Sequence, residues 1–313
     1  MGGYLFTNGA RVSPRPDDPI PLFDPGRLAD VRPTAAGLLL GGALRQRRDQ
    51  CGIAMKIAAK AINASVSKVS RLERAESPPD LRDVEKLAAT YKVSAEDRAQ
   101  LEVLARRAVE AEWFEPFLDF TPVWMHRLMG LEAECAQLMT YEMKIVPGLL
   151  QTDDYARQII SNGLPVSGAD QVEPRVRLRQ ERQKRFFGQN QPPQAIFLLD
   201  ESIIFRQVGS PKTMSGQLLK LLNLVDVPEV SIRFVPFDST VVSNHASMTH
   251  LVFGTGGLPP MVYIEGNDDA TYHSKAEDVE RHVELMLRLS AEAAASRRES
   301  RSMLQRALER FSD

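Results

Sequence analysis

Ser65, Val66, Ser67, Lys68 and Arg71 are the residues of this sequence whose types and spacing favour chemistry with a nucleic acid. They bring hydroxyl groups, an apolar side chain and two cations to one short stretch. A guanidinium can hydrogen-bond to a guanine edge, an ammonium can hold a phosphate, and a valine can contact a thymine methyl group in the major groove. We therefore predict that this stretch reads duplex DNA, with Arg71 on a guanine and Lys68 on a phosphate.

A short helix must carry these side chains. Ser65 is suited to cap its first turn, and Val69 and Leu72 follow at helical spacing. When both apolar residues face inward, the hydroxyl and basic side chains remain on an outer face that is thin enough to enter a groove. This outer face is the predicted reading surface.

A second helix is expected directly upstream. Residues 53–62 repeat apolar side chains at helical spacing, and Asn63 then interrupts the pattern. Asparagine adopts the left-handed backbone conformation more readily than most non-glycine residues, so it suits the tight turn between two helices. The stretch predicts a helix-turn-helix, with Ala54 and Met55 near the DNA backbone.

The charge of this region supports the same prediction. The whole chain carries a net charge of −2, but residues 45–74 hold eight basic and two acidic residues, a local balance of +6. A basic module on a neutral or acidic body is typical of DNA-binding proteins. The alternative is a solvated helical surface with scattered basic side chains.

Around these residues, the sequence resembles the Xre (Cro/repressor-like) helix-turn-helix family between residues 35 and 100. The shared positions are Leu40-Gly41, Leu44-Arg45, Arg48, Gly52, Ala58-Ala59 and residues 67–73. The resemblance implies a small helical bundle in which a structural ion pair between Arg48 and Glu73 joins the first helix to the third. Val66 stands where the family commonly has a base-reading Gln.

Length and composition fit a globular protein of two domains. The chain has 313 residues, of which 43% are apolar and 26% are charged. It contains no apolar run near the ~20 residues that span a bilayer. Cys51 and Cys135 are too few for a disulfide framework or a zinc site. We expect a cytoplasmic protein without a metal or a cofactor.

The predicted organisation has four parts. Residues 1–33 are a flexible Pro-rich arm, either a disordered tail or an arm that reaches a minor groove, and residues 34–110 are the DNA-binding domain. Residues 111–124 are an aromatic hinge, for which base stacking is the alternative role. Residues 125–313 are a regulatory, partner-binding and dimerisation domain.

The second domain mixes strand-like and helical patterns. Strand-like runs occupy residues 194–199, 230–236, 248–253, 261–265 and 270–273, and helical patterns occupy residues 128–141, 175–185, 211–225 and 275–289. Turns too short for crossover helices separate the last strands, so these should pair antiparallel. The predicted fold is an all-α helix-turn-helix bundle followed by an α+β domain with a mainly antiparallel sheet and C-terminal helices.

This second domain is similar to the uncharacterised domain that follows such a helix-turn-helix in many regulators from high-GC bacteria. The similarity rests on residues 146–156, 179–180, 199–206, 208–209, 217–218 and 262–265. Members of that family are often encoded beside a small partner protein and are described as antitoxin-like. The resemblance implies that the domain senses a small protein partner or a ligand.

The polar candidates for a ligand or partner pocket are Glu201, Arg206 and Glu265, for which structural ion pairs are the alternative. No catalytic residues are predicted, because the carboxylates at strand ends lack an accompanying nucleophile, phosphate loop or metal-ligand spacing. We predict a sequence-specific transcriptional regulator that binds double-stranded DNA as a homodimer. The alternatives are an interaction or antitoxin module with vestigial DNA binding, and an enzyme that modifies a small molecule.

Overall fold

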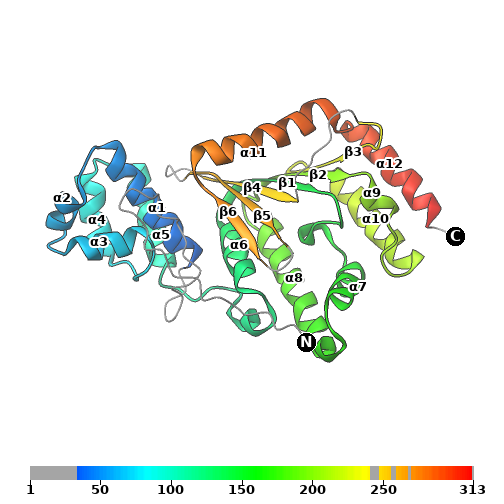
Figure 1. Cartoon of the computed structure of the whole chain (residues 1–313), viewed down its shortest axis with the longest axis horizontal. Helices are drawn as coiled ribbons and strands as arrows, with labels where there is room; N and C mark the ends of the chain where they lie inside the picture. The colour runs from blue at the N-terminus through cyan, green and yellow to red at the C-terminus, as the bar shows by residue number, and fades with distance from the viewer. Residues whose placement is uncertain (1–33, 240–246, 255–258, 267–268, 312–313) are drawn as a thin grey trace, which may run out of the picture. The chain divides into compact units, whose positions relative to one another are not determined.

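The computed structural model describes residues 34–239, 247–254, 259–266 and 269–311. The arm predicted at residues 1–33 lies outside these described residues. Helices come first along the chain, and helices and strands then follow one another up to the C-terminal helices (Figure 1). The fold class is therefore the predicted one, an N-terminal helical region followed by an α+β domain.

Five helices open the described chain. They are α1 (Ala35–Gln50), α2 (Met55–Ala61), α3 (Val66–Glu73), α4 (Leu81–Thr90) and α5 (Ala95–Arg107). Thr34, Ser65, Asp80 and Ser94 cap α1, α3, α4 and α5, and each accepts a hydrogen bond from a backbone N–H of the first turn. These short polar side chains fix where the four helices begin.

The core of this bundle is built from aliphatic side chains. Leu40 and Leu44 of α1 are buried with Val69 of α3, Leu87 of α4 and Leu101 of α5. Burial of such side chains is the main source of stability for helices as short as α2 and α3, because isolated helices of this length are marginal in water. The position of α3 therefore depends on α1, α4 and α5.

Helix α1 belongs to two cores. Its later residues Leu40 and Leu44 pack in the bundle, whereas Ala35 and Leu39 are buried with Leu131 in the core of the α+β domain. A Cβ atom at Gly130 of α6 (Val123–Glu134) would lie 2.6 Å from the Cβ of Ala35, so the close packing of α1 against α6 requires glycine at this position. One helix thus connects the interiors of both halves.

In its described residues, the second half contains six strands and further helices. The helical elements before the sheet's second strand are η1 (Glu115–Phe120), α6 (Val123–Glu134), η2 (Gly148–Leu150), α7 (Asp153–Gly163), η3 (Val166–Gln171) and α8 (Val172–Phe187). Those after it are α9 (Ser202–Phe205), α10 (Pro211–Val225), α11 (Ala276–Arg288), the π-helical turn η4 (Leu289–Ala293) and α12 (Arg297–Arg310).

The strands form one mixed sheet. They are β1 (Cys135–Glu142), β2 (Gln194–Asp200), β3 (Val230–Val235), β4 (Met248–Phe253), β5 (Met261–Glu265) and β6 (Ala270–His273), in the order β3-β2-β1-β4-β5-β6. The β1–β2 and β2–β3 pairs are parallel, and the β1–β4, β4–β5 and β5–β6 pairs are antiparallel. The predicted antiparallel pairing of the last strands is confirmed.

Helices cover both faces of the sheet (Figure 1). Leu198 of β2 is buried with Val279 and Met286 of α11 on one face. Its neighbour Phe197 is buried on the other face with residues of α10 and α12, among them Leu218. Successive residues of a strand point to opposite faces, so a continuous apolar run such as β2 is what a strand buried on both sides requires.

The helix predicted within residues 128–141 is wrong in its second half. Helix α6 ends at Glu134, and β1 begins at Cys135. The spacing of Leu131, Cys135 and Leu138 fits one face of a helix, yet β1 lies between β2 and β4 and forms backbone hydrogen bonds on both edges. Pairing with two strands outweighs the local helical pattern.

The aromatic segment predicted as a hinge packs on the α+β domain. Phe114 is buried with Met129 of α6 and Leu178 of α8, and Trp113 and Phe117 pack against this cluster. In the same segment, the carboxylate of Glu112 accepts a 2.8 Å hydrogen bond from the backbone N–H of Ala35 at the start of α1. The segment therefore touches the helix that both cores share.

Candidate nucleic-acid interface

The turn between α2 and α3 is held by a left-handed residue. Asn63 has a φ of 54°, and the backbone N–H of Ala64 donates a 2.9 Å hydrogen bond to the carbonyl of Ala59. A β-branched or bulky residue would be strained in this conformation, whereas asparagine tolerates it. Asn63 thus lets α3 follow α2 after a short turn.

The side chains of α3 divide as the sequence predicts. Ser65 Oγ accepts a 3.2 Å hydrogen bond from Lys68 N and caps the helix. Val69 and Leu72 are buried in the bundle. The predicted reading residues Ser65, Val66, Ser67, Lys68 and Arg71 are all exposed, and of the predicted backbone contacts Ala54 is exposed and Met55 half-buried.

The two cations of this helix have different surroundings. Lys68 Nζ lies 2.5 Å from a carboxylate oxygen of Asp83 on α4, and this hydrogen bond raises the pKa of Lys68. Within the described part of the chain, the side chain of Arg71 has no hydrogen bond or ion pair. Arg71 is therefore ready to bind a base edge, whereas Lys68 must share its charge with Asp83. Asp83 is not among the predicted site residues. The sequence signal that could have identified it is its position as an acidic residue in the first turn of α4.

Val66 is an exposed apolar residue at the start of the helix. Its exposed fraction is 46%, so this apolar side chain is accessible at the surface of the bundle. The side chain of Val66 forms no hydrogen bonds with water, but it can contact the methyl group of a thymine. The residue type fits apolar readout better than hydrogen bonding.

The last turn of α3 is fixed to α1 by a buried ion pair. Arg48 Nε donates to Glu73 Oε1 at 2.7 Å, and Arg48 Nη2 donates to Glu73 Oε2 at 2.9 Å. The two side chains are 9% and 3% exposed, and the hydrogen bond to Glu73 raises the pKa of Arg48. A bidentate pair of this kind sets orientation as well as distance, so it fixes how α3 sits on α1.

Gly41 allows α1 to approach the same turn. A Cβ atom at this position would lie 2.6 Å from the carbonyl oxygen of Glu73 and 2.8 Å from that of Leu72. Backbone atoms cannot rotate away as a side chain can, so any residue other than glycine would push the helices apart. The close contact with α1 fixes the backbone of α3, and the ion pair fixes its last turn through the side chains.

Comparison with known families gives two matches on this chain. A model described as a helix-turn-helix domain matches residues 39–101. A model described as a domain of unknown function (DUF5753) matches residues 125–306, more than half of the chain. The chain belongs to the DUF5753 family. Neither curated proteins nor solved structures gave a match.

The helix-turn-helix match covers α2, the turn at Asn63 and α3. It indicates a DNA-binding regulator. Among the residues that the structure describes, no helix is long and apolar enough to cross a membrane.

The pocket candidates of the DUF5753 domain have separate hydrogen-bond partners. Glu201 accepts a 2.9 Å hydrogen bond from the backbone N–H of Phe237, and Arg206 is exposed just after α9. Glu265 accepts a 3.1 Å hydrogen bond from the hydroxyl of Tyr263, and desolvation raises the pKa of Glu265. No hydrogen bond or ion pair joins any two of these three described residues. Each has its own surroundings.

The motif at residues 146–156 in the DUF5753 domain is a structural network. The side chain of Gln151 donates a 2.6 Å hydrogen bond to the carbonyl of Val146 and accepts one from Arg179. Buried Gln217 of α10 accepts a 2.7 Å hydrogen bond from Thr152 N and donates one of 2.8 Å to the carbonyl of Leu150. These buried amides are satisfied within the protein, so they fix the loop between β1 and α7.

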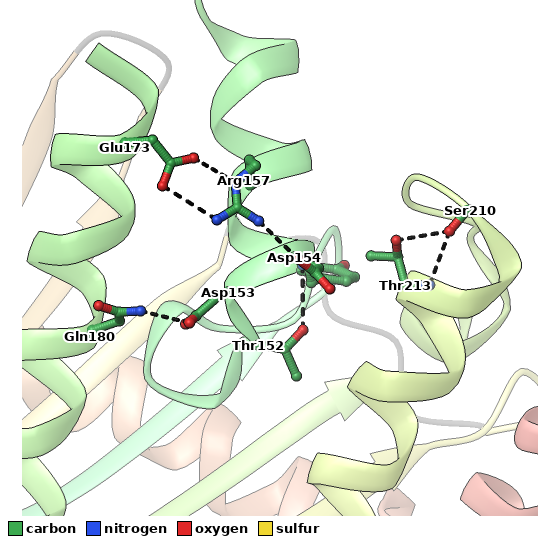
Figure 2. A network of polar contacts seen from close by, with 9 residues as sticks. Thr152, Asp153, Asp154, Arg157, Glu173, Gln180, Ser210 and Thr213 are labelled. Carbon is green, nitrogen blue, oxygen red and sulfur yellow. Dashed lines mark hydrogen bonds and ion pairs between the residues drawn. The ribbon is translucent and has the colours of Figure 1, made fainter. Parts of the chain in front are cut away.

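Outside this buried network, exposed polar contacts join α7 to α8. Figure 2 shows Arg157 of α7 between Glu173 of α8, at 2.5 Å, and Asp154, at 2.8 Å. In the same view, Gln180 of α8 donates a 2.6 Å hydrogen bond to Asp153. Of the two neighbouring aspartates, Asp153 thus contacts α8 and Asp154 pairs with Arg157 within α7, so each has its own partner and they do not form an acid–base pair with each other.

Proposed function

We propose that this protein is a sequence-specific transcriptional regulator of the Xre type whose helix α3 enters the major groove of operator DNA. The observation that supports this most is the state of α3: exposed reading residues lie on a helix fixed by a buried ion pair and a glycine contact. A rigid support of this kind lowers the entropic cost of binding, because α3 is already held in place before it meets DNA.

Each predicted residue has a role in this proposal. Arg71 contacts a guanine, Val66 contacts a thymine methyl group, and Lys68 contacts a phosphate while it also pairs with Asp83. Ser65 and Ser67 hydrogen-bond to the DNA, and Ala54 and Met55 approach its backbone at the start of α2. The exposure of these side chains supports the assignment.

Replacing Arg71 by alanine should cost about 1 to 3 kcal/mol of binding free energy, and specificity should be lost at a single base position. The measurement is fluorescence anisotropy on DNA from the protein's own promoter and on single-base variants. Lys68→Ala should weaken all these sequences alike. Arg106→Ala removes the same charge from an exposed position on α5 and should bind as the wild type does. If Arg71→Ala binds the promoter as tightly as wild type, α3 is not the reading helix.

The regulator is further proposed to act in the cytoplasm as a homodimer, because two copies that read half-sites about 34 Å apart gain affinity. In this proposal, the DUF5753 domain provides the dimer contact and senses a small protein partner or a ligand, as antitoxin-like regulators do. Light scattering that gives the mass of one chain, both free and on operator DNA, would exclude the dimer. Equal affinity for the partner with and without DNA would exclude sensing.

A second candidate function is an interaction module with vestigial DNA binding. The ion pair of Lys68 with Asp83 favours it, because this pair partly neutralises one reading cation. Salt-sensitive binding of the purified protein to its promoter distinguishes the two functions, since phosphate contacts release counterions and a vestigial domain makes none.

A further inference from the structure

A small cavity lies where η1, α6 and α8 meet in the DUF5753 domain. Its volume is about 180 Å³. Helix α6 contributes Trp124 and Met129 to its wall, and α8 contributes Leu178 and three arginines, Arg175, Arg179 and Arg182. The three arginines are four and three residues apart, so they lie along one side of α8. The cavity is therefore apolar and cationic, and none of the predicted pocket residues lines it.

The arginines are not equally neutralised. Arg182 forms a bidentate ion pair with Glu132 of α6, with both N···O distances at 2.6 Å. Neither Arg175 nor Arg179 forms an ion pair with any residue that the structure describes. Glu265 acts on Arg179 only as a more remote opposite charge. Two cations at the cavity thus lack a carboxylate.

Arg179 is held in a desolvated position. Burial lowers the pKa of Arg179 to about 10, and repulsion by Arg182 adds to this effect. Among the described residues, its single hydrogen-bond acceptor is the neutral amide oxygen of Gln151. A guanidinium has five N–H donors, and one neutral acceptor compensates only part of the hydration that this half-buried group loses.

Arg175 also has an unused donor. Its Nη2 donates a 3.0 Å hydrogen bond to Gln171, but its buried Nε meets no acceptor in the described part of the chain. Burial also lowers the pKa of Arg175. Buried donors of a charged group are rarely left without an acceptor, so a hydrogen-bond acceptor is expected beside Arg175 Nε.

A purely structural role explains these arginines poorly. Arg179 does hold Gln151, and Arg175 does hold Gln171, but a neutral donor would satisfy either amide oxygen without the cost of burying a charge. A bound anion would supply the missing negative charge and accept the remaining hydrogen bonds. The arrangement is therefore better explained as a site for an anion.

We propose that this cavity binds a small aromatic carboxylate, with its ring against Trp124 and Met129 and its carboxylate between Arg175 and Arg179. The fork of a guanidinium matches the two oxygens of a carboxylate. A protein cavity of about 150 Å³ admits benzene, so the space here fits one ring with one small acidic group. This inference rests on the ligand sensing proposed for the DUF5753 domain, and it names the chemical class of that ligand.

The first test is calorimetric titration of the full-length protein, without DNA, with benzoate and with its neutral isostere benzamide at constant ionic strength. Benzoate should bind about 10-fold to 100-fold more tightly than benzamide, because only benzoate brings a negative charge and two equivalent acceptor oxygens to the guanidinium groups. Equal affinities, or no heat from benzoate, would overturn the proposal. The titration contains no DNA, so its failure is distinguishable from a failure of operator binding.

The second test uses variants of α8. Arg175→Gln and Arg179→Gln should each weaken benzoate binding by about 10-fold or more and leave the affinity for benzamide unchanged. Arg177→Gln removes the same charge from an exposed position of the same helix and should leave both affinities unchanged. Because Arg179 also holds Gln151, the melting temperature of each variant is measured alongside. A folded Arg175→Gln variant with wild-type benzoate affinity would overturn the proposed site.

Discussion

Replacing Glu73 by alanine is expected to lower the free energy of unfolding by about 3 to 5 kcal/mol, because the buried charge of Arg48 would lose its bidentate partner. The expected loss lies toward the lower end, since Arg48 Nη1 also contacts Asp49 at 2.6 Å. Urea denaturation followed by circular dichroism measures it. Operator binding should weaken as well, because the pair orients the last turn of α3 on α1.

Two further variants distinguish the stability lost with the Arg48–Glu73 ion pair from the effect of removing any carboxylate. Glu76→Ala deletes an exposed carboxylate that pairs with Arg74 just beyond α3, and it should change stability by less than about 1 kcal/mol. Replacing both partners, as in Arg48→Met with Glu73→Leu, should cost less than Glu73→Ala alone, because no buried charge remains. A Glu73→Ala protein as stable as the wild type would show that the pair does not hold the bundle.

Replacing Gly41 by alanine is expected to destabilise the protein by about 1 to 3 kcal/mol, since the added methyl group would meet backbone atoms of α3. The carbonyl oxygen of Glu73 would lie 2.6 Å from the new Cβ. The expected response is a shift of α1 away from α3, which would also weaken operator binding. Urea denaturation and anisotropy on promoter DNA measure the two effects.

The neighbouring glycine is a matched control. Gly42 lies in the same helix, and a Cβ atom there would have no heavy atom within 4 Å. Gly42→Ala should therefore stabilise the protein by up to about 1 kcal/mol, because alanine favours the helical conformation. The two substitutions have the same chemistry and opposite expected signs. Equal effects would mean that the packing of α1 on α3 is looser than the structure shows.

Much of this fold follows from local patterns. The helix α10 and the strands β4 and β5 occupy the ranges that periodicity predicts, because each has an apolar repeat bounded by Pro, Gly or polar residues. The caps Ser65 and Ser94 likewise act within one turn of their own helix. Information of this kind is contained in a few adjacent residues.

Other features depend on contacts that a local pattern does not contain. The strand β1 takes its conformation from β2 and β4, which lie far along the chain. The spacing of Arg175, Arg179 and Arg182 is visible in the sequence and fits a solvated helix face equally well. Only the packing of α6 and η1 on α8 shows that these arginines are desolvated at a cavity.

Helix α1 limits how this protein can be divided. The helix-turn-helix match begins at residue 39 and the DUF5753 match at residue 125, so the first turn of α1 belongs to neither. Yet Ala35 in that turn is buried against Gly130 of α6. A fragment that contains only the bundle would expose the start of α1 to water, and a fragment that contains only the α+β domain would lose part of its interior. The start of α1 therefore couples the stability of the two regions, and exchanging the DNA-binding region for that of a relative would require the contact surface of α1 to be transferred with it.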